Sequence, residues 1–211
     1  GDHFEMLLPE DVAEPVAKRL RMYVLRSKVV LADVSADTRR FGVGGPAATT
    51  ALVAAFGAAP ATHTVMQIAQ ATILGLPGPR FVLLAAPGEA EALQARLAGH
   101  ATAAEFEVWQ WLTIRAGVPI VTAATQDALV AQVANWDVLG GVDFKKGCYT
   151  GQEIIARTHY LGRLKERTFL FHADPPDASP GDRIFSSAFD AQPCGTVVNA
   201  ADRDAVKSAF D

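Results

Sequence analysis

A short glycine-punctuated turn late in the chain constrains the fold more than any other part of the sequence. Gly147 and Gly151 bracket Cys148, so the backbone can turn tightly there and a ligand can approach it closely. Thr150 and Glu153 have the spacing of a capping box, which predicts a helix beginning at about Gly151. The segment therefore predicts a tight turn that carries a cysteine to the start of a helix.

The cysteine in this turn is a candidate reactive thiol. Lys145 and Lys146 come just before it, and the positive end of the expected helix follows it. Both features favour the thiolate, which is the nucleophilic form. His159 could act as its base. The alternatives are a small buried residue in a tight turn for Cys148 and an ordinary polar role for His159.

The chain has two cysteines, too few for the disulfide framework of a small secreted domain. Cys148 and Cys194 do not form a CxxC pair, so we expect no metal site built from this chain alone. Cys194 precedes Gly195 in a strand-like run and is expected to be a core thiol.

The 211 residues carry a net charge of −4, which argues against a general nucleic-acid binder. The charge is nevertheless unevenly distributed. Residues 16–28 hold five basic residues and no acid, and residues 145–167 hold six basic residues against two acids. Two basic stretches on an acidic body indicate a local anion site, or simply two solvated faces.

Half of the residues are hydrophobic, which is enough to bury a core as one large domain or two small ones. No apolar run approaches the roughly 18 residues that span a bilayer, so we expect no membrane partner. The first residues carry no signal-peptide pattern, and we expect a cytoplasmic protein.

Apolar spacing and turn residues predict alternating strands and helices. The expected strands are 4–8, 29–34 and 81–85, and the expected helices are 9–26, 47–56 (ended by Gly57), 87–97 and 105–116, with 126–136 a further candidate. This order predicts an α+β fold. Short strands expected at 167–172, 183–186 and 194–198 then predict the beginning of a small β module near residue 165.

Three tryptophans can be assigned roles from their neighbours. Trp109 and Trp111 belong to a predicted helix and are expected to be packing residues. Trp136 lies between Asn135 and Asp137 and could line a pocket, because an aromatic plane stacks on a flat ring.

The eight residues KGCYTGQE, 146–153, are followed by Arg157, and the segments 20–28 and 139–144 flank them. Together they resemble the signature of the YgfZ family and a similar motif in mitochondrial iron–sulfur assembly factors. The motif is long, ungapped and contains a cysteine, so it is far more specific than a lone glycine-rich loop. The resemblance covers most of residues 1 to about 200.

The resemblance implies the fold of the glycine cleavage T-protein, with ferredoxin-like α/β layers around a central channel that takes tetrahydrofolate. On that basis residues 1–164 form the folate-binding α+β region, as two intertwined subdomains, and residues 165–211 form part of a C-terminal β-barrel. Family members have a further N-terminal segment that supplies part of the first domain, and we expect it and the end of the barrel to be absent here.

The resemblance also implies a set of site residues. Cys148 is the functional thiol of the signature, and no residue is expected to bind metal. The expected folate-binding residues are Lys146, Tyr149, Gln152, Glu153, Arg157, Arg115, Trp136, Asn135, Arg26 and Lys28.

One position departs from the T-protein pattern. T-proteins place a Glu before an Ala-Gly pair, where it contacts the pterin, and this chain has Arg115 there. A Glu accepts paired hydrogen bonds from the pterin, whereas Arg can only donate. The departure weakens folate binding in the T-protein manner and leaves open an inverted pterin, another folate form or another anionic ligand.

The resemblance implies a folate-binding accessory protein for iron–sulfur cluster assembly or repair, with iron–sulfur proteins or their assembly machinery as transient partners. Two alternatives remain: an aminomethyltransferase of the glycine cleavage type, which Arg115 and Cys148 disfavour, and an accessory protein of tRNA modification. The acidic total charge disfavours direct tRNA binding. Whether the protein turns over a substrate, as a tetrahydrofolate-dependent one-carbon transferase would, is left open.

Overall fold

A computed structural model of the chain describes residues 3–173, 177–202 and 206. The chain divides into two compact units. The first unit comprises residues 1–31 and 117–200, and the second comprises residues 32–116 and 201–211. Residues 32–116 of the second unit are therefore inserted into the first unit along the sequence. The predicted boundary near residue 165 falls inside the first unit, and a barrel beginning there stays a prediction.

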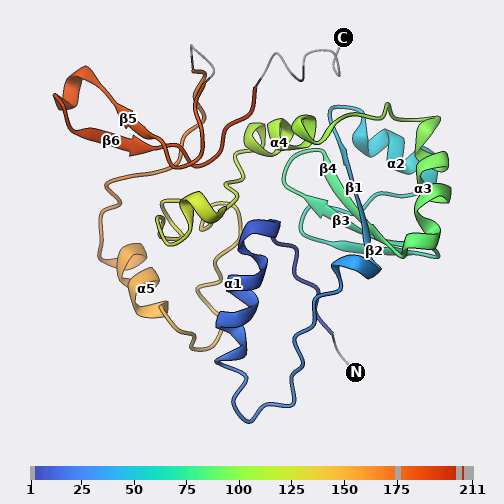
Figure 1. The fold of residues 1–211 in the computed structure, drawn as a ribbon, viewed down its shortest axis with the longest axis horizontal. Helices are drawn as coiled ribbons and strands as arrows, with labels where there is room; N and C mark the ends of the chain where they lie inside the picture. Colours follow the sequence, from blue (N-terminus) through green and yellow to red (C-terminus); the bar gives the residue numbers. More distant parts are fainter. Residues whose placement is uncertain (1–2, 174–176, 203–205, 207–211) are drawn as a thin grey trace. The chain divides into compact units, whose positions relative to one another are not determined.

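The second unit is built on a four-stranded antiparallel sheet in the order β1-β4-β3-β2 (Figure 1). Its strands are β1 (Arg39–Gly44), β2 (Val65–Ile68), β3 (Ala71–Leu76) and β4 (Arg80–Ala85). Its helices are α2 (Ala48–Phe56), α3 (Ala90–Ala98) and α4 (Phe106–Arg115), with short 3-10 turns η1 (Ser35–Asp37) and η2 (Pro87–Glu89). Helices and antiparallel sheets together confirm the α+β class.

Alternate residues of the strands supply the core of this unit. Ile73 and Leu83 are directly paired across β3 and β4 and are fully buried. They pack in one cluster with Leu52 of α2 and Leu97 of α3. Because strand side chains alternate between faces, one face of the sheet meets α2 and α3. Gly57 ends α2 with φ 83° and donates to Val53 O at 2.8 Å, which confirms the predicted helix end.

The other face of β1 receives α4. A Cβ on Gly42 would overlap the ring of Trp109, so only glycine permits this close approach. Beside it Arg80 is only 2% exposed, and its guanidinium donates to Thr113 Oγ1 at 2.6 Å and lies 5.3 Å from the Trp109 ring centroid. Burial lowers the pKa of Arg80. Trp109 is therefore a packing residue, as predicted.

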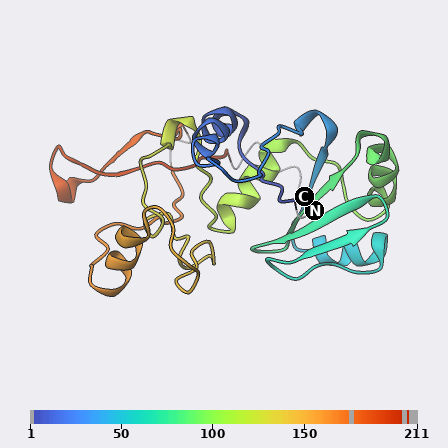
Figure 2. The ribbon, with the colours of Figure 1, turned by 90° about the horizontal axis from the view of Figure 1, so that it is seen from below.

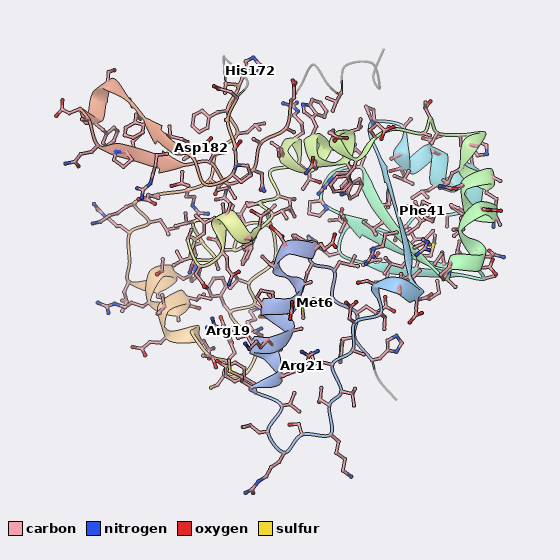
Figure 3. All side chains as sticks on the ribbon, in the orientation of Figure 1. Met6, Arg19, Arg21, Phe41, His172 and Asp182 are labelled. Carbon is pink, nitrogen blue, oxygen red and sulfur yellow. The ribbon has the colours of Figure 1, made fainter. Side chains whose placement is uncertain are left out.

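The first unit has less regular structure. It contains α1 (Glu10–Arg21), η3 (Ala123–Thr125), α5 (Gln152–Tyr160), and a hairpin of β5 (Arg183–Phe185) and β6 (Pro193–Thr196) around η4 (Ser187–Phe189). Asp182 lies at the base of the hairpin, where its carboxylate accepts from Ser179 N at 2.7 Å (Figure 3). The hairpin confirms the predicted strands near 183–186 and 194–198. Cys194, however, is only half-buried and donates to Ile184 O, so it is not a core thiol.

Several predicted elements are wrong. Residues 4–8, 29–34 and 167–172 are not strands, residues 126–136 form turns, and the helix predicted over 9–26 ends at Arg21. The sequence did not predict β1, β2 or β3. None of the helices in the described part of the chain has the length and hydropathy needed to cross a membrane.

Candidate functional site

The cysteine-bearing segment, residues 144–151, forms a loop that we call the signature loop. It leads directly into α5, and Gly151 at the junction has φ 88°, which glycine adopts without strain. Gln152 N donates to Tyr149 O at 3.2 Å, and Ile155 N donates to Gly151 O at 3.4 Å. The helix begins where the sequence predicted, but the expected capping box is wrong, because no side chain caps its first turn.

The opposite end of the signature loop is held by aromatic contacts. The ring of Phe144 stacks on His159 with centroids 4.0 Å apart and meets Tyr160 edge-on at 6.4 Å. His159 and Tyr160 form the last turn of α5. The signature loop is therefore fixed at both ends to one helix, by backbone hydrogen bonds at its end and by ring packing at its start (Figure 2 shows α5 and the chain that leads into it).

Cys148 lies within this anchored loop and is exposed to solvent. The alternative of a small buried residue is therefore wrong. On either side of it, Lys146 Nζ lies 4.5 Å from the centroid of the Tyr149 ring, a cation–π contact that orders the neighbouring side chains. His159 makes ring contacts with Phe144 and Tyr160, so it has a packing role, and its use as a base for Cys148 stays a prediction.

A cluster of hydrogen-bonded side chains, which we call the polar clasp, is linked to α5 within the same unit. Its members are Gln132, Asn135, Asp137, Arg167 and Thr168. Arg167 forms a two-pronged ion pair with Asp137, at 3.0 Å from Nη1 to Oδ1 and 2.9 Å from Nη2 to Oδ2. These hydrogen bonds lower the pKa of Asp137 despite the opposing effect of desolvation, and the carboxylate raises the pKa of Arg167.

The remaining bonds of the polar clasp join three separate segments. Gln132 Nε2 donates to Ile155 O of α5 at 2.8 Å. Asn135 Nδ2 donates to Thr168 O at 2.7 Å, and its Oδ1 accepts from Arg167 at 2.9 Å. Thr168 N donates to Val133 O at 2.9 Å. The clasp thus ties the turns around 130–138 to α5 and to residues 167–168.

This geometry gives Asn135 a structural task that the sequence did not indicate. Both ends of its amide are already bonded within the protein, and its φ of 58° places it in the left-handed region that Asn tolerates. Trp136 is half-buried and packs against Gly141, where a Cβ would come within 3.2 Å of the Trp136 Cβ. Folate contacts by these two residues stay predictions.

The structure places the other predicted ligand residues in two units. Glu153 and Arg157 are exposed on α5, and Gln152 is half-buried at its start. Arg26 and Lys28 are exposed in the segment after α1, the helix that carries Arg19 and Arg21 (Figure 3). Arg115 belongs to the second unit and lies 5.5 Å from the Trp111 ring centroid, which is consistent with the packing role predicted for Trp111.

Gln132 and Arg167 were not predicted as important. Gln132 is only 1% exposed although it stands in the apolar run LVAQVA, and a lone amide in such a run was the available signal. Arg167 had been counted only as part of a basic stretch. Within residues 3–173, 177–202 and 206, no group of three or more His, Cys, Asp or Glu side chains could hold a metal ion.

No protein-family model matches the chain. It is 39% identical over 153 residues to the tRNA-modifying protein YgfZ of Yersinia pseudotuberculosis serotype IB (strain PB1/+), which covers 71% of this chain and 46% of that protein. It is 34% identical over 186 residues to the tRNA-modifying protein YgfZ of Sodalis glossinidius (strain morsitans), which covers 86% of this chain and 56% of that protein. The chain spans about half the length of these curated relatives. With this identity over most of its own length, and with the signature motif in place, the chain belongs to the YgfZ family.

Proposed function

We propose that this chain carries the working thiol of a cytoplasmic, folate-binding accessory factor that supports tRNA modification by maintaining iron–sulfur enzymes. The observation that carries the proposal is the exposed Cys148 on a loop anchored at both ends to α5. The name of the relatives, tRNA-modifying protein YgfZ, favours tRNA modification, and the resemblance of the signature to iron–sulfur assembly factors favours a cluster-related route.

The anchored loop suits a thiol that must meet another protein. Because Cys148 is exposed, a client protein or an assembly factor can reach its sulfur without any part of this chain unfolding. Because both ends of the loop are already held, little conformational entropy is lost when a partner contacts it. Transient contact with iron–sulfur proteins is the use that we propose for this arrangement.

The proposed ligand is tetrahydrofolate or a folate derivative, bound in a T-protein-like fold. Lys146 and Arg157 are exposed and form no ion pair with any described residue, so their charge is available to an anionic glutamate tail. Arg26 and Lys28 offer the same chemistry from the segment after α1. Arg115 can only donate hydrogen bonds, so any contact that it makes with folate is to an acceptor atom.

The proposal is tested in a deletion strain, compared with the same strain after the full-length gene has been restored. Two readouts are used. Modified tRNA nucleosides are measured by mass spectrometry, and a [4Fe–4S] enzyme unrelated to tRNA is assayed under oxidative stress. We expect both to fall on deletion and both to recover with the wild-type gene. A loss of tRNA modification with the unrelated [4Fe–4S] enzyme intact would contradict the iron–sulfur route.

A second comparison separates the remaining alternatives. A gel shift with tRNA at moderate salt is expected to show no complex, since the proposed action is indirect. A tight complex would point to direct action on tRNA. Loss of glycine cleavage in the same deletion strain would instead favour aminomethyl transfer.

A further inference from the structure

Gln132 is a buried amide that the packing of the first unit does not explain. Its side chain is fully enclosed, and its Nε2 donates to Ile155 O at 2.8 Å. Its Oε1 has no hydrogen-bond partner among the described residues. A buried acceptor without a donor destabilises a protein, whereas an apolar side chain of the same shape would not. Stability alone therefore would not select an amide at this position.

Among the described residues, the hydrogen bond that the Gln132 side chain makes is directed at the helix that carries the signature loop. Ile155, whose carbonyl accepts that bond, donates its own N–H to Gly151 O. The N–H of Gln152, in the same peptide unit as the Gly151 carbonyl, donates to Tyr149 O, and Tyr149 adjoins Cys148. These hydrogen bonds, together with the backbone of Ile155, connect the buried amide through the first turn of α5 to the residue beside the thiol.

The turn that bears Gln132 is itself fixed from the other side. Arg167 Nη1 donates to Gln132 O at 3.3 Å, and the same guanidinium holds Asp137 and Asn135. Gln132 therefore projects from a backbone that is hydrogen-bonded to the guanidinium of the polar clasp. An amide held in this way can define the position of a helix along its own axis.

From this geometry we infer that Gln132 is a positioning residue for Cys148: it holds the first turn of α5, and through it the end of the signature loop, in place. The inference rests on the proposed function only in taking Cys148 as the working thiol. Gln132 touches neither the thiol nor a ligand, and its effect is exerted through Ile155. The polar clasp supplies the fixed point from which it acts.

The test uses Gln132→Met, which keeps the volume and removes the amide, with Gln126→Met as the matched control. Gln126 is exposed in the same segment and forms no hydrogen bond through its side chain among the described residues. Hydrogen exchange of the full chain is followed by mass spectrometry, and native alkylation of Cys148 by iodoacetamide is quantified on its own peptide. Gln132→Asn, an amide too short to reach Ile155, serves if the Met variant folds poorly.

We expect exchange at the amides of Gln152 and Ile155 to accelerate about fivefold in either Gln132 variant, the factor equivalent to about 1 kcal/mol for one hydrogen bond. Exchange in α1 and in the β5–β6 hairpin should stay at the wild-type rate. The alkylation rate of Cys148 should differ from the alkylation rate measured in the wild-type protein. Gln126→Met should change none of these. Unchanged exchange at α5, or equal acceleration across the first unit, would overturn the inference.

The two claims fail differently. Normal rescue of the deletion strain by Cys148→Ala would remove the proposed function, whatever Gln132 does. Failed rescue by Cys148→Ala, combined with wild-type exchange in Gln132→Met, would remove the positioning role and leave the proposed function standing.

Discussion

Asn135 offers the clearest test of the polar clasp, because one substitution removes two bonds and strains the backbone. Asn135→Ala deletes the 2.7 Å bond to Thr168 O and the 2.9 Å bond from Arg167. It also forces an alanine to adopt φ 58°. Asn135→Gly deletes the same two bonds but accepts the positive φ, so the pair of variants separates hydrogen bonding from backbone strain.

The magnitude follows from these contacts. The bond to Thr168 contributes about 1 kcal/mol, and placing alanine in the left-handed region costs about 1 kcal/mol more. We add nothing for the bond from Arg167, whose guanidinium is partly exposed and screened by solvent. Asn135→Ala should therefore destabilise the clasp by about 2 kcal/mol, a factor of about 30 in an equilibrium, and Asn135→Gly by about 1 kcal/mol.

The assay is native-state hydrogen exchange at the amide of Thr168, which donates to Val133 O beside Asn135. Exchange is preferred to a single unfolding curve, because the two units need not unfold together. Acceleration below about threefold in Asn135→Ala, or equal acceleration in the two variants, would refute the reasoning.

Two further predictions concern the clasp and the second unit. Arg167 lowers the pKa of Asp137. Below the unfolded pKa of about 3.9, the unfolded state therefore binds more protons than the native state, so the ion pair contributes its full stability only above that pH. This contribution is lost as the pH falls through the native pKa of Asp137. An acid titration followed by Trp136 fluorescence should show that step, and Asp137→Asn should lack it. Gly42→Ala should destabilise the second unit by about 1–3 kcal/mol through overlap with the Trp109 ring, whereas Gly99→Ala, whose Cβ meets open space, should be near neutral in urea unfolding.

The elements that could be predicted from the sequence carry their own boundary signals. Gly57 ends α2 in the left-handed conformation, and Gly151 precedes α5 in the same conformation. The run FVLLA matched β4, a central strand whose residues are buried on both faces. In each case a local property, a positive φ or a continuous apolar run, decides the structure.

The failures depend on partners that a local pattern cannot show. Residues 4–8 and 29–34 have strand-like composition, but no neighbouring strand pairs with them in the described structure. Residues 126–136 have apolar residues at helical spacing, yet Asp127 and Asn135 adopt positive φ and break the helix into turns. β1 was missed because its glycines, which admit Trp109, resemble a loop.

The candidate site could be predicted only where its parts are local in the sequence. The motif identified Cys148 and the start of α5, both of which are local in the sequence. The polar clasp joins residues 132–137 to residues 155 and 167–168, and only the fold brings these together. Asn135 was accordingly predicted as a ligand residue, although its amide is bonded within the protein.

We propose that the exposed thiol of Cys148 is the functional group of this protein. The most direct measurement is rescue of tRNA modification and of [4Fe–4S] enzyme activity in a deletion strain by the full-length gene, wild type or Cys148→Ala, at matched protein levels. Cys194→Ala is the control, because that half-buried thiol donates its hydrogen bond to Ile184 O within its own hairpin. We expect rescue by wild type and by Cys194→Ala, and failure of rescue by Cys148→Ala. Equal rescue by all three would contradict a functional role for the Cys148 thiol.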